Sequence, residues 1–245
     1  MRLLLINPNT TAHVTARMVE QARKSAGLRA QVDGATATFG PAIIGSRVEN
    51  AIAAHAALDL AAERAASYDA VILGVSMDTA LHELRALLVI PVIGMAQAAL
   101  LQAQMLGQRI GCLTIGPQML PLYREVTESY GLGDRAVWRA ITLPAAYGAD
   151  PGPDVTKAVG AAVQAMIRDD SVDVVMLCGA VLAGLSDQIP AKVPVIDCID
   201  AATRMAILMV ESGHAQRTGM TGLSGRASVG LGAALTDRLW ADAPR

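Results

Sequence analysis

The chain has 245 residues, of which 53% are hydrophobic and 3% aromatic, and its formal net charge is −2. This balance gives no indication of a nucleic acid or an anionic membrane as partner. The length suffices for one large domain or two small lobes. A core of Ala, Val, Ile, Leu and Met is typical of a parallel sheet covered by Ala-rich helices. The apolar surplus also predicts a homo-oligomer, because it exceeds what one such core would bury.

Apolar runs alternate with helical segments along the whole chain. The predicted strands are 3–6, 30–33, 69–74, 89–93, 109–114, 137–143, 173–177 and 193–196. The predicted helices are 11–25, 48–66, 79–87, 96–106, 117–130, 154–168, 201–210 and 233–240. This alternation predicts an α/β fold with parallel sheets and right-handed crossovers.

One pattern occurs twice. An Asp-led apolar strand begins at Asp69 and again at Asp173, and each is followed by a Pro-Val-Ile run, at Pro91 and Pro194. An Ala-Ala pair follows each proline at the same spacing. The repeat predicts two pseudo-symmetric lobes, each a mostly parallel sheet flanked by helices. The predicted lobes are residues 1–95 with 214–245, and residues 96–213.

The three cysteines, Cys112, Cys178 and Cys198, lie in or beside apolar runs and form no CxxC pair. Their odd number and the absence of a secretion signal predict buried free thiols in a reducing cytoplasm. No apolar run reaches the length of about 18 residues that spans a membrane. No phosphate-binding, dinucleotide-binding or metal-ligand motif is present, so we expect a site without metal or cofactor.

In parallel sheets, ligands bind beyond the carboxyl ends of the strands, so we expect a small-molecule site between the two lobes. The loops at these ends are 7–11, 75–79, 114–119 and 178–183. Asn7, Asn9 and Thr10 in the first loop, and Thr114 in the third, offer amides and hydroxyls near a helix N-terminus, which suits a carboxylate or a carbonyl. Capping and turn formation explain the same residue types.

Candidate proton-transfer groups follow the repeated strands. Ser76 offers a hydroxyl. Asp78 either contributes a carboxylate or caps the helix beginning at Thr79. Cys178 either ionises near backbone amides and acts as acid or base, or is an inert buried thiol.

The other ionisable candidates are more scattered. His82 is the best alternative acid or base, whereas His13 and His55 fall on helices with polar neighbours and are expected on solvated faces. Arg47 precedes a helix and either binds a carboxylate or lies on the surface.

The sequence resembles the Asp/Glu/hydantoin racemase superfamily, and most closely its hydantoin and allantoin racemase branch. The residues that carry the resemblance are Ile6-Asn7-Pro8-Asn9-Thr10, Phe39-Gly40-Pro41, Asp69-Ala70-Val71-Ile72, Pro91-Val92-Ile93-Gly94, Asp173-Val174-Val175 and Pro194-Val195-Ile196-Asp197. The resemblance implies two α/β lobes, a site between them and no cofactor. It also implies a cysteine at the tip of each Asp-led strand, one removing the proton α to a carbonyl and the other returning it on the opposite face.

The chain departs from this pattern at both cysteine positions, which fall on Val75 and Gly179. One residue of slip brings in Ser76 and Cys178. A single-thiol arrangement resembles the arylmalonate decarboxylases of this superfamily, in which one cysteine protonates a carbanion after loss of carbon dioxide. A second departure, Ile43-Ile44-Gly45-Ser46-Arg47, indicates a carboxylate substrate held by Arg47.

Together these features predict a cofactor-independent enzyme acting at the carbon next to a carbonyl of a small carboxylate or cyclic amide. Cys178 would be the acid or base, with Ser76 or Asp78 opposite. The oxygens of the substrate would be held by Asn7, Asn9, Thr10, Arg47 and Thr114. The backbone at Val75, Gly179 and Ala180 would stabilise an enolate-like intermediate. The alternatives are a one-thiol lyase acting on a small dicarboxylate and a ligand-binding homologue without catalysis.

Overall fold

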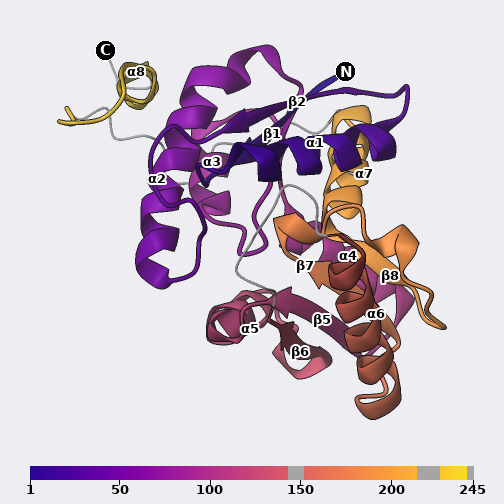
Figure 1. Ribbon diagram of the computed structural model, residues 1–245. Helices are drawn as coiled ribbons and strands as arrows, with labels where there is room; N and C mark the ends of the chain where they lie inside the picture. The colour runs from indigo at the N-terminus through magenta and orange to yellow at the C-terminus, as the bar shows by residue number, and fades with distance from the viewer. Residues whose placement is uncertain (143–151, 214–226, 242–245) are drawn as a thin grey trace.

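The computed structural model describes residues 1–142, 152–213 and 227–241, which form two four-stranded parallel sheets with helices around them (Figure 1). The first sheet has the order β2-β1-β3-β4 and consists of β1 (Arg2–Asn7), β2 (Gln31–Thr36), β3 (Ala70–Leu73) and β4 (Val92–Gly94). The second has the order β6-β5-β7-β8 and consists of β5 (Ile110–Ile115), β6 (Ala136–Ile141), β7 (Val174–Cys178) and β8 (Val195–Asp197). The predicted α/β fold with two lobes, each a parallel sheet flanked by helices, is confirmed.

Helices connect the strands of each sheet and link the sheets. They are α1 (Ala12–Ala26), α2 (Arg47–Arg64), α3 (Leu81–Leu87), α4 (Met95–Leu106), α5 (Leu120–Ser129), α6 (Gly152–Asp169), α7 (Cys198–Glu211) and α8 (Ala233–Ala241). The helix predicted from residue 117 is divided into a short 3-10 turn, Pro117–Met119, and α5.

The aspartates that lead the repeated strands make equivalent contacts. The carboxylate of Asp69 accepts a hydrogen bond of 2.6 Å from the backbone N–H of Arg2, where β1 begins. The carboxylate of Asp173 accepts bonds of 2.8 Å from the N–H groups of Gln108 and Arg109, just before β5. Each aspartate therefore fixes the start of the neighbouring central strand, which gives the repeat a physical reason in both lobes.

Helices α4 and α7 pack against each other between the sheets. The repeated Ala-Ala pairs, Ala98-Ala99 and Ala201-Ala202, are buried on these helices. Helix α4 follows β4 but also contacts β7, and α7 follows β8 but also contacts β3 and β4. One hydrophobic cluster consequently contains side chains of both lobes. Because this packing is shared, the lobe boundaries drawn after residues 95 and 213 stay a prediction.

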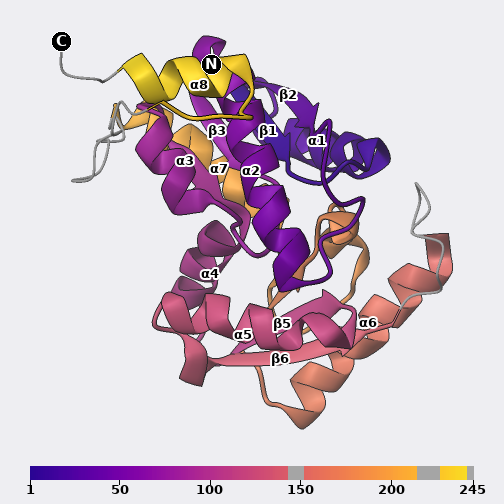
Figure 2. The ribbon, with the colours of Figure 1, turned by 90° about the vertical axis from the view of Figure 1, so that its left-hand side faces the viewer.

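Helix α8 lies against α2 of the first lobe (Figure 2). Leu235 is 4% exposed and belongs to the same hydrophobic cluster as Leu60 and Ala61. The guanidinium of Arg238 donates a hydrogen bond of 3.3 Å to the carbonyl of Ala62. Residues 214–226 and 242–245, also predicted to belong to this lobe, lie outside the described residues.

The surface of the described residues bears on two further predictions. Exposed apolar side chains on α4 and α7, among them Leu101, Met105 and Leu208, accord with a homo-oligomer, which stays a prediction. Within the described ranges, no helix combines the length and the apolar character needed to cross a membrane. The cytoplasmic location also stays a prediction.

Candidate functional site between the two sheets

A cavity of about 560 Å³ lies at the carboxyl ends of both sheets. Its lining comes from the loops that follow β1, β3, β5 and β7, together with residues 42–45. Within the described part of the chain, no Asp, Glu, Lys or Arg lines it. The described lining is therefore free of carboxylates, ammonium groups and guanidinium groups and carries a few polar side chains, as is common for small-molecule sites.

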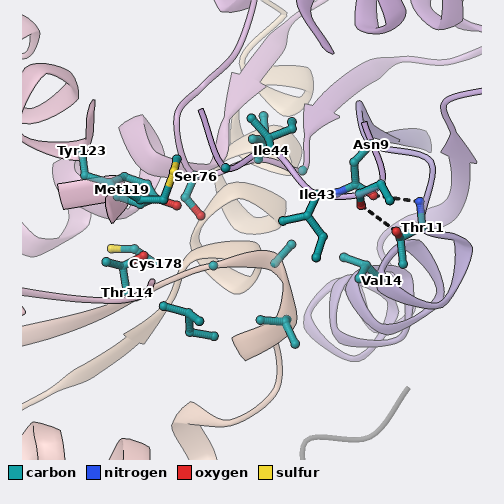
Figure 3. A pocket seen from close by; sticks show the side chains of 18 of the residues that line it. Asn9, Thr11, Val14, Ile43, Ile44, Ser76, Thr114, Met119, Tyr123 and Cys178 are labelled. Carbon is teal, nitrogen blue, oxygen red and sulfur yellow. Dashed lines mark hydrogen bonds between the residues drawn. The ribbon is translucent and has the colours of Figure 1, made fainter. Parts of the chain in front are cut away.

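Four polar side chains gather at one end of this cavity, which we call the hydroxyl-thiol end: Ser76, Thr114, Tyr123 and Cys178 (Figure 3). Thr114 and Cys178 are register partners on β5 and β7. Ser76 follows β3 of the other sheet, and Tyr123 projects from α5. Both lobes therefore contribute to this end.

The hydroxyl of Ser76 is buried without a partner. The residue is 4% exposed, and its Oγ atom makes no hydrogen bond within the described residues. Leaving a buried hydroxyl unsatisfied costs roughly 1–3 kcal/mol. Because Ser76 lines the cavity, a bound ligand can supply the missing partner.

Tyr123 is held rigidly at the same end. It is 8% exposed, and its ring stacks on Trp138 with centroids 4.9 Å apart. Burial raises the pKa of Tyr123 to about 12. The hydroxyls of Thr114 and Ser76 moderate this rise, although neither contact has the geometry of a hydrogen bond. At neutral pH the tyrosine is a neutral hydrogen-bond donor.

Cys178 is 1% exposed and lines the cavity where β7 ends. Its thiol donates a weak hydrogen bond of 3.7 Å to the carbonyl of Met176. Burial raises the pKa of Cys178 well above the ordinary value, and the neighbouring Cys112 and Cys198 thiols add to the effect. All three cysteines are free and buried. The resting thiol is therefore protonated at neutral pH and can deliver a proton.

The loop after β1 contributes to the cavity differently from its prediction. Asn7 is fully buried and does not line the cavity, because its Nδ2 donates to Thr15 Oγ1 at 2.9 Å and to Asn9 Oδ1 at 3.0 Å. Thr10 does not line it either, and its backbone N–H donates to the carbonyl of Pro41 at 3.0 Å. Asn9 lines the cavity as predicted, whereas Asn7 and Thr10 shape the loop that presents it.

Asp78 faces away from the cavity. Its carboxylate accepts hydrogen bonds from the N–H groups of Ala96 (2.9 Å) and Gln97 (2.8 Å) and from the hydroxyl of Tyr130 (2.7 Å). Burial raises the pKa of Asp78, and these three bonds oppose the rise. The aspartate therefore caps α4 rather than the helix after Thr79, because the chain returns there after β4.

Asp197 caps the N-terminus of α7 in the same way as Asp78 caps that of α4. Its carboxylate accepts bonds from the N–H groups of Ile199 (2.8 Å) and Asp200 (3.1 Å), at the start of α7. It also accepts a bond from Gly184 (2.5 Å), in the loop after β7. A buried carboxylate thus joins the strand-end loop to the following interior helix in both lobes.

Arg47 does not reach the cavity. Its guanidinium pairs with the carboxylate of Glu125 on α5, with one contact of 2.8 Å, and both side chains are at least half exposed. This ion pair joins the lobes on the outside. The expectation that Arg47 binds a substrate carboxylate does not fit this position, because the charge is already paired.

The positions of two histidines relative to the cavity differ from the prediction. His82 is exposed on α3 and does not line the cavity. His13 lines the cavity, and its Nε2 atom is buried without a hydrogen-bond partner in the described ranges. His13 is half-buried rather than on a fully solvated helix face, because the loop after β1 turns the first residues of α1 towards the cavity.

Seven of the lining residues were predicted from the sequence: Asn9, Val75, Ser76, Thr114, Cys178, Gly179 and Ala180. The polar lining residues that were not predicted are Thr11, His13, Gln118 and Tyr123. Thr11 lies in one of the strand-end loops predicted from the sequence, so its position beside the cavity follows from the same argument as that of Asn9. Tyr123 lies inside a helix, where no local signal marks it. No three His, Cys, Asp or Glu side chains of the described chain gather as a metal site.

Comparison with known proteins agrees with this architecture. The profile of the Asp/Glu/Hydantoin racemase family matches residues 3–206. A hydantoin racemase from Rhizobium meliloti is 29% identical over 220 residues, which cover 88% of this chain and 91% of that protein. The crystal structure of allantoin racemase from Pseudomonas fluorescens superposes with a TM-score of 0.83 at 30% identity, covering 89% of this chain and 94% of that one. Allantoin racemase from Klebsiella pneumoniae gives the same TM-score at 27% identity, covering 89% and 90%.

Proposed function

Because the chain belongs to the Asp/Glu/hydantoin racemase family, we propose that it is a cofactor-independent enzyme that exchanges the proton on the carbon next to a carbonyl of a hydantoin-like cyclic amide. The observation that carries this proposal is the meeting of the Cys178 thiol and the unpartnered Ser76 hydroxyl at one end of an uncharged cavity.

The uncharged lining favours a neutral substrate over a small carboxylate. A carboxylate entering this space would give up its hydration without meeting a cation, which is costly. A cyclic amide loses less hydration and offers carbonyl oxygens to the hydroxyls of Thr114 and Tyr123. Arg47, the one cation suggested for a carboxylate, is engaged by Glu125.

The strand ends can stabilise the negative charge that develops when the proton leaves. No hydrogen bond within the described residues uses the backbone N–H groups of Ser76 and Ala180, which follow Val75 and Gly179. Donors that are fixed before the reaction stabilise an enolate oxygen without reorganisation. These two groups would therefore act on the substrate carbonyl.

Cys178 would transfer the proton. Its thiolate removes the proton, the electron pair passes to the carbonyl oxygen, and the thiol can return the proton. Inversion needs delivery on the opposite face, for which Ser76 is the polar side chain that the first lobe contributes to the hydroxyl-thiol end. Serine alone is a poor acid or base. In this mechanism Ser76 would therefore pass on a proton from Tyr123 or from water.

A one-thiol lyase acting on a small dicarboxylate is the second candidate, and the raised pKa of Cys178 favours it. A protonated thiol suits the delivery of one proton to a carbanion left by loss of carbon dioxide. An apolar cavity would also destabilise the departing carboxylate. The third candidate, a binding protein, keeps the cavity but moves no proton.

Proton exchange in heavy water tests the three candidates together. The protein is incubated with single enantiomers of 5-substituted hydantoins and, separately, with arylmalonates, while NMR follows the α C–H signal and carbon dioxide is measured. Deuterium incorporation above the buffer rate supports the proposal, and carbon dioxide release supports the lyase. Thermal stabilisation by a ligand with neither signal indicates a binding protein.

The Cys178→Ala variant tests whether Cys178 transfers the proton. We expect it to abolish exchange while ligand binding persists. The matched control is Cys112→Ala, which removes a neighbouring buried thiol that does not line the cavity. Full exchange activity in Cys178→Ala would overturn the role of this cysteine.

A further inference from the structure

The cavity has a second polar end, opposite the hydroxyl-thiol end. Asn9 and Thr11 lie together there, far from Cys178 and Thr114, and Val14 lies beside them (Figure 3). His13 lies between Thr11 and Val14 in the chain and also lines the cavity. Ile43 stands between the two ends in the same view. The cavity is thus polar at both ends and apolar in between.

Two nitrogen atoms at this second end lack a hydrogen-bond partner among the described residues. Asn9 Oδ1 accepts hydrogen bonds from Asn7 Nδ2 at 3.0 Å and from the N–H of Thr11 at 2.9 Å. These bonds fix the orientation of the amide, and they leave its Nδ2 group without a partner among the described residues. The Nε2 atom of His13 is buried and also unpartnered there.

From this arrangement we propose that Asn9 and His13 form a distal subsite for a hydrogen-bond acceptor at the far end of the substrate. This subsite rests on the proposed function, in which the reacting ring occupies the hydroxyl-thiol end. The substituent of the ring then passes Ile43, and the terminal oxygen of the substituent reaches Asn9 Nδ2 and His13 Nε2. The acceptor is a carboxamide oxygen, because no Lys or Arg among the described lining residues would pair with a carboxylate. A five-membered ring alone leaves much of the 560 Å³ empty, so an elongated substrate matches the cavity better.

The second end should favour substrates with a polar end group, because a polar and an apolar end group differ in the free energy of binding there. A terminal oxygen satisfies the buried His13 Nε2, in the tautomer that carries its proton there, together with the Nδ2 group of Asn9, whereas an apolar end group leaves His13 Nε2 buried and unpaired. Sites built to hydrogen-bond a group discriminate strongly against an analogue that lacks it. We therefore expect the second end to set substrate preference without taking part in proton transfer.

Binding of three matched probes tests the subsite. The probes are hydantoins whose 5-substituent is 2-carbamoylethyl, 2-carboxyethyl or 3-methylbutyl, and their dissociation constants are measured by calorimetry. We expect the carbamoylethyl probe to bind at least about tenfold more tightly than the 3-methylbutyl probe. The carboxyethyl and carbamoylethyl arms distinguish an anionic from a neutral acceptor. Equal affinity for all three would overturn the proposal.

Two variants assign the preference to these residues. His13→Phe keeps the ring shape and removes the nitrogen, and Asn9→Asp keeps the oxygen that holds the loop and replaces the free donor by an acceptor. We expect both to lose the preference while affinity for the 3-methylbutyl probe persists. The control is His55→Phe, because His55 also has a buried Nε2 without a partner among the described residues but does not line the cavity. Asn9→Asp keeps the test decisive if His13→Phe does not fold.

Exchange of the 5-methylhydantoin proton, measured in parallel, separates the two proposals. A preference in binding without any exchange leaves the distal subsite standing and contradicts the proposed function. Exchange without a preference supports the proposed function and overturns the subsite.

Discussion

The hydroxyl of Tyr130, at the end of α5, donates a hydrogen bond of 2.7 Å to the buried carboxylate of Asp78. The bond joins the second lobe to the loop after β3, next to Ser76. Asp78 also holds the N-terminus of α4. One carboxylate therefore ties a cavity loop to an interior helix and to the opposite lobe.

Tyr130→Phe should destabilise the protein by roughly 1–3 kcal/mol, because it removes one of three donors from a buried carboxylate. Burial raises the pKa of Asp78, so its contribution is complete below the unfolded pKa and is lost as pH rises through the folded pKa. The substitution raises the folded pKa further. The loss in urea unfolding should therefore be larger at pH 8 than at pH 4.

Tyr68→Phe is the matched control for Tyr130→Phe. The hydroxyl of Tyr68 donates a bond of 3.1 Å to Asp33, whose side chain is 43% exposed. We expect a small loss in the free energy of unfolding, without strong pH dependence. Equal pH profiles for the two variants would contradict the role assigned to Asp78.

Proton exchange by the wild-type protein should accelerate with pH. The pKa of Cys178 is raised well above the ordinary value by burial, so the thiolate fraction increases about tenfold for each pH unit below that pKa. Initial rates of deuterium incorporation between pH 6.5 and 9 measure this slope. An optimum on the acid side of neutrality would instead indicate another base.

Ser76→Ala should separate stability from activity. Removing an unpartnered buried hydroxyl should leave the free energy of unfolding unchanged or raise it by up to about 1 kcal/mol. Exchange should fall by roughly 10- to 100-fold, because the ligand loses its contact with this hydroxyl. Calorimetric unfolding and exchange rates measure the two effects.

Thr203→Val provides the comparison for Ser76→Ala. Thr203 is fully buried on α7, away from the cavity, and its hydroxyl donates a bond of 2.7 Å to the carbonyl of Ile199. The Thr203→Val variant should have a free energy of unfolding about 1 kcal/mol lower than that of the wild-type protein and an unchanged rate of proton exchange. A stability loss in Ser76→Ala as large as that in Thr203→Val would mean that Ser76 is satisfied in the resting protein.

Val75→Cys should increase inversion of a chiral hydantoin. Val75 lines the cavity after β3, and cysteine is smaller, so the change introduces a thiol opposite Cys178 without crowding. General acid-base catalysis contributes about 10²-fold or more, and polarimetry measures the gain. The double variant Val75→Cys with Cys178→Ala should lose it.

Gly179→Cys makes the complementary thiol in the second lobe. Gly179 has a φ of 157°, which side chains rarely adopt, so this variant should be less stable than Val75→Cys. Equal stability of the two single variants would contradict the assigned strain.

Arg47→Gln should change the dissociation constant of a neutral hydantoin by no more than about twofold, because exposed ion pairs contribute little. The guanidinium pairs with Glu125 outside the cavity. Glu125→Gln is the control and should behave alike. A large loss of affinity in Arg47→Gln that is absent in Glu125→Gln would indicate that Arg47 contacts the substrate, as predicted from the sequence.

The sequence by itself determined the architecture. Strand and helix patterns are local, and the repeated Asp and Pro-Val-Ile runs recur where each lobe needs them, as the equivalent bonds of Asp69 and Asp173 show. The carboxyl ends of parallel strands meet at one edge, so the loops holding Asn9, Ser76, Thr114 and Cys178 could be assigned to one site before any contact was known.

Only the tertiary structure decided what individual polar side chains do. Asp78 caps α4 and Arg47 pairs with Glu125 because partners distant in the chain arrive there. His13 faces the cavity because the loop after β1 sets the direction of α1. Residue type and local pattern fix where strands and helices form, but whether a charge or hydroxyl is satisfied depends on groups brought together by packing.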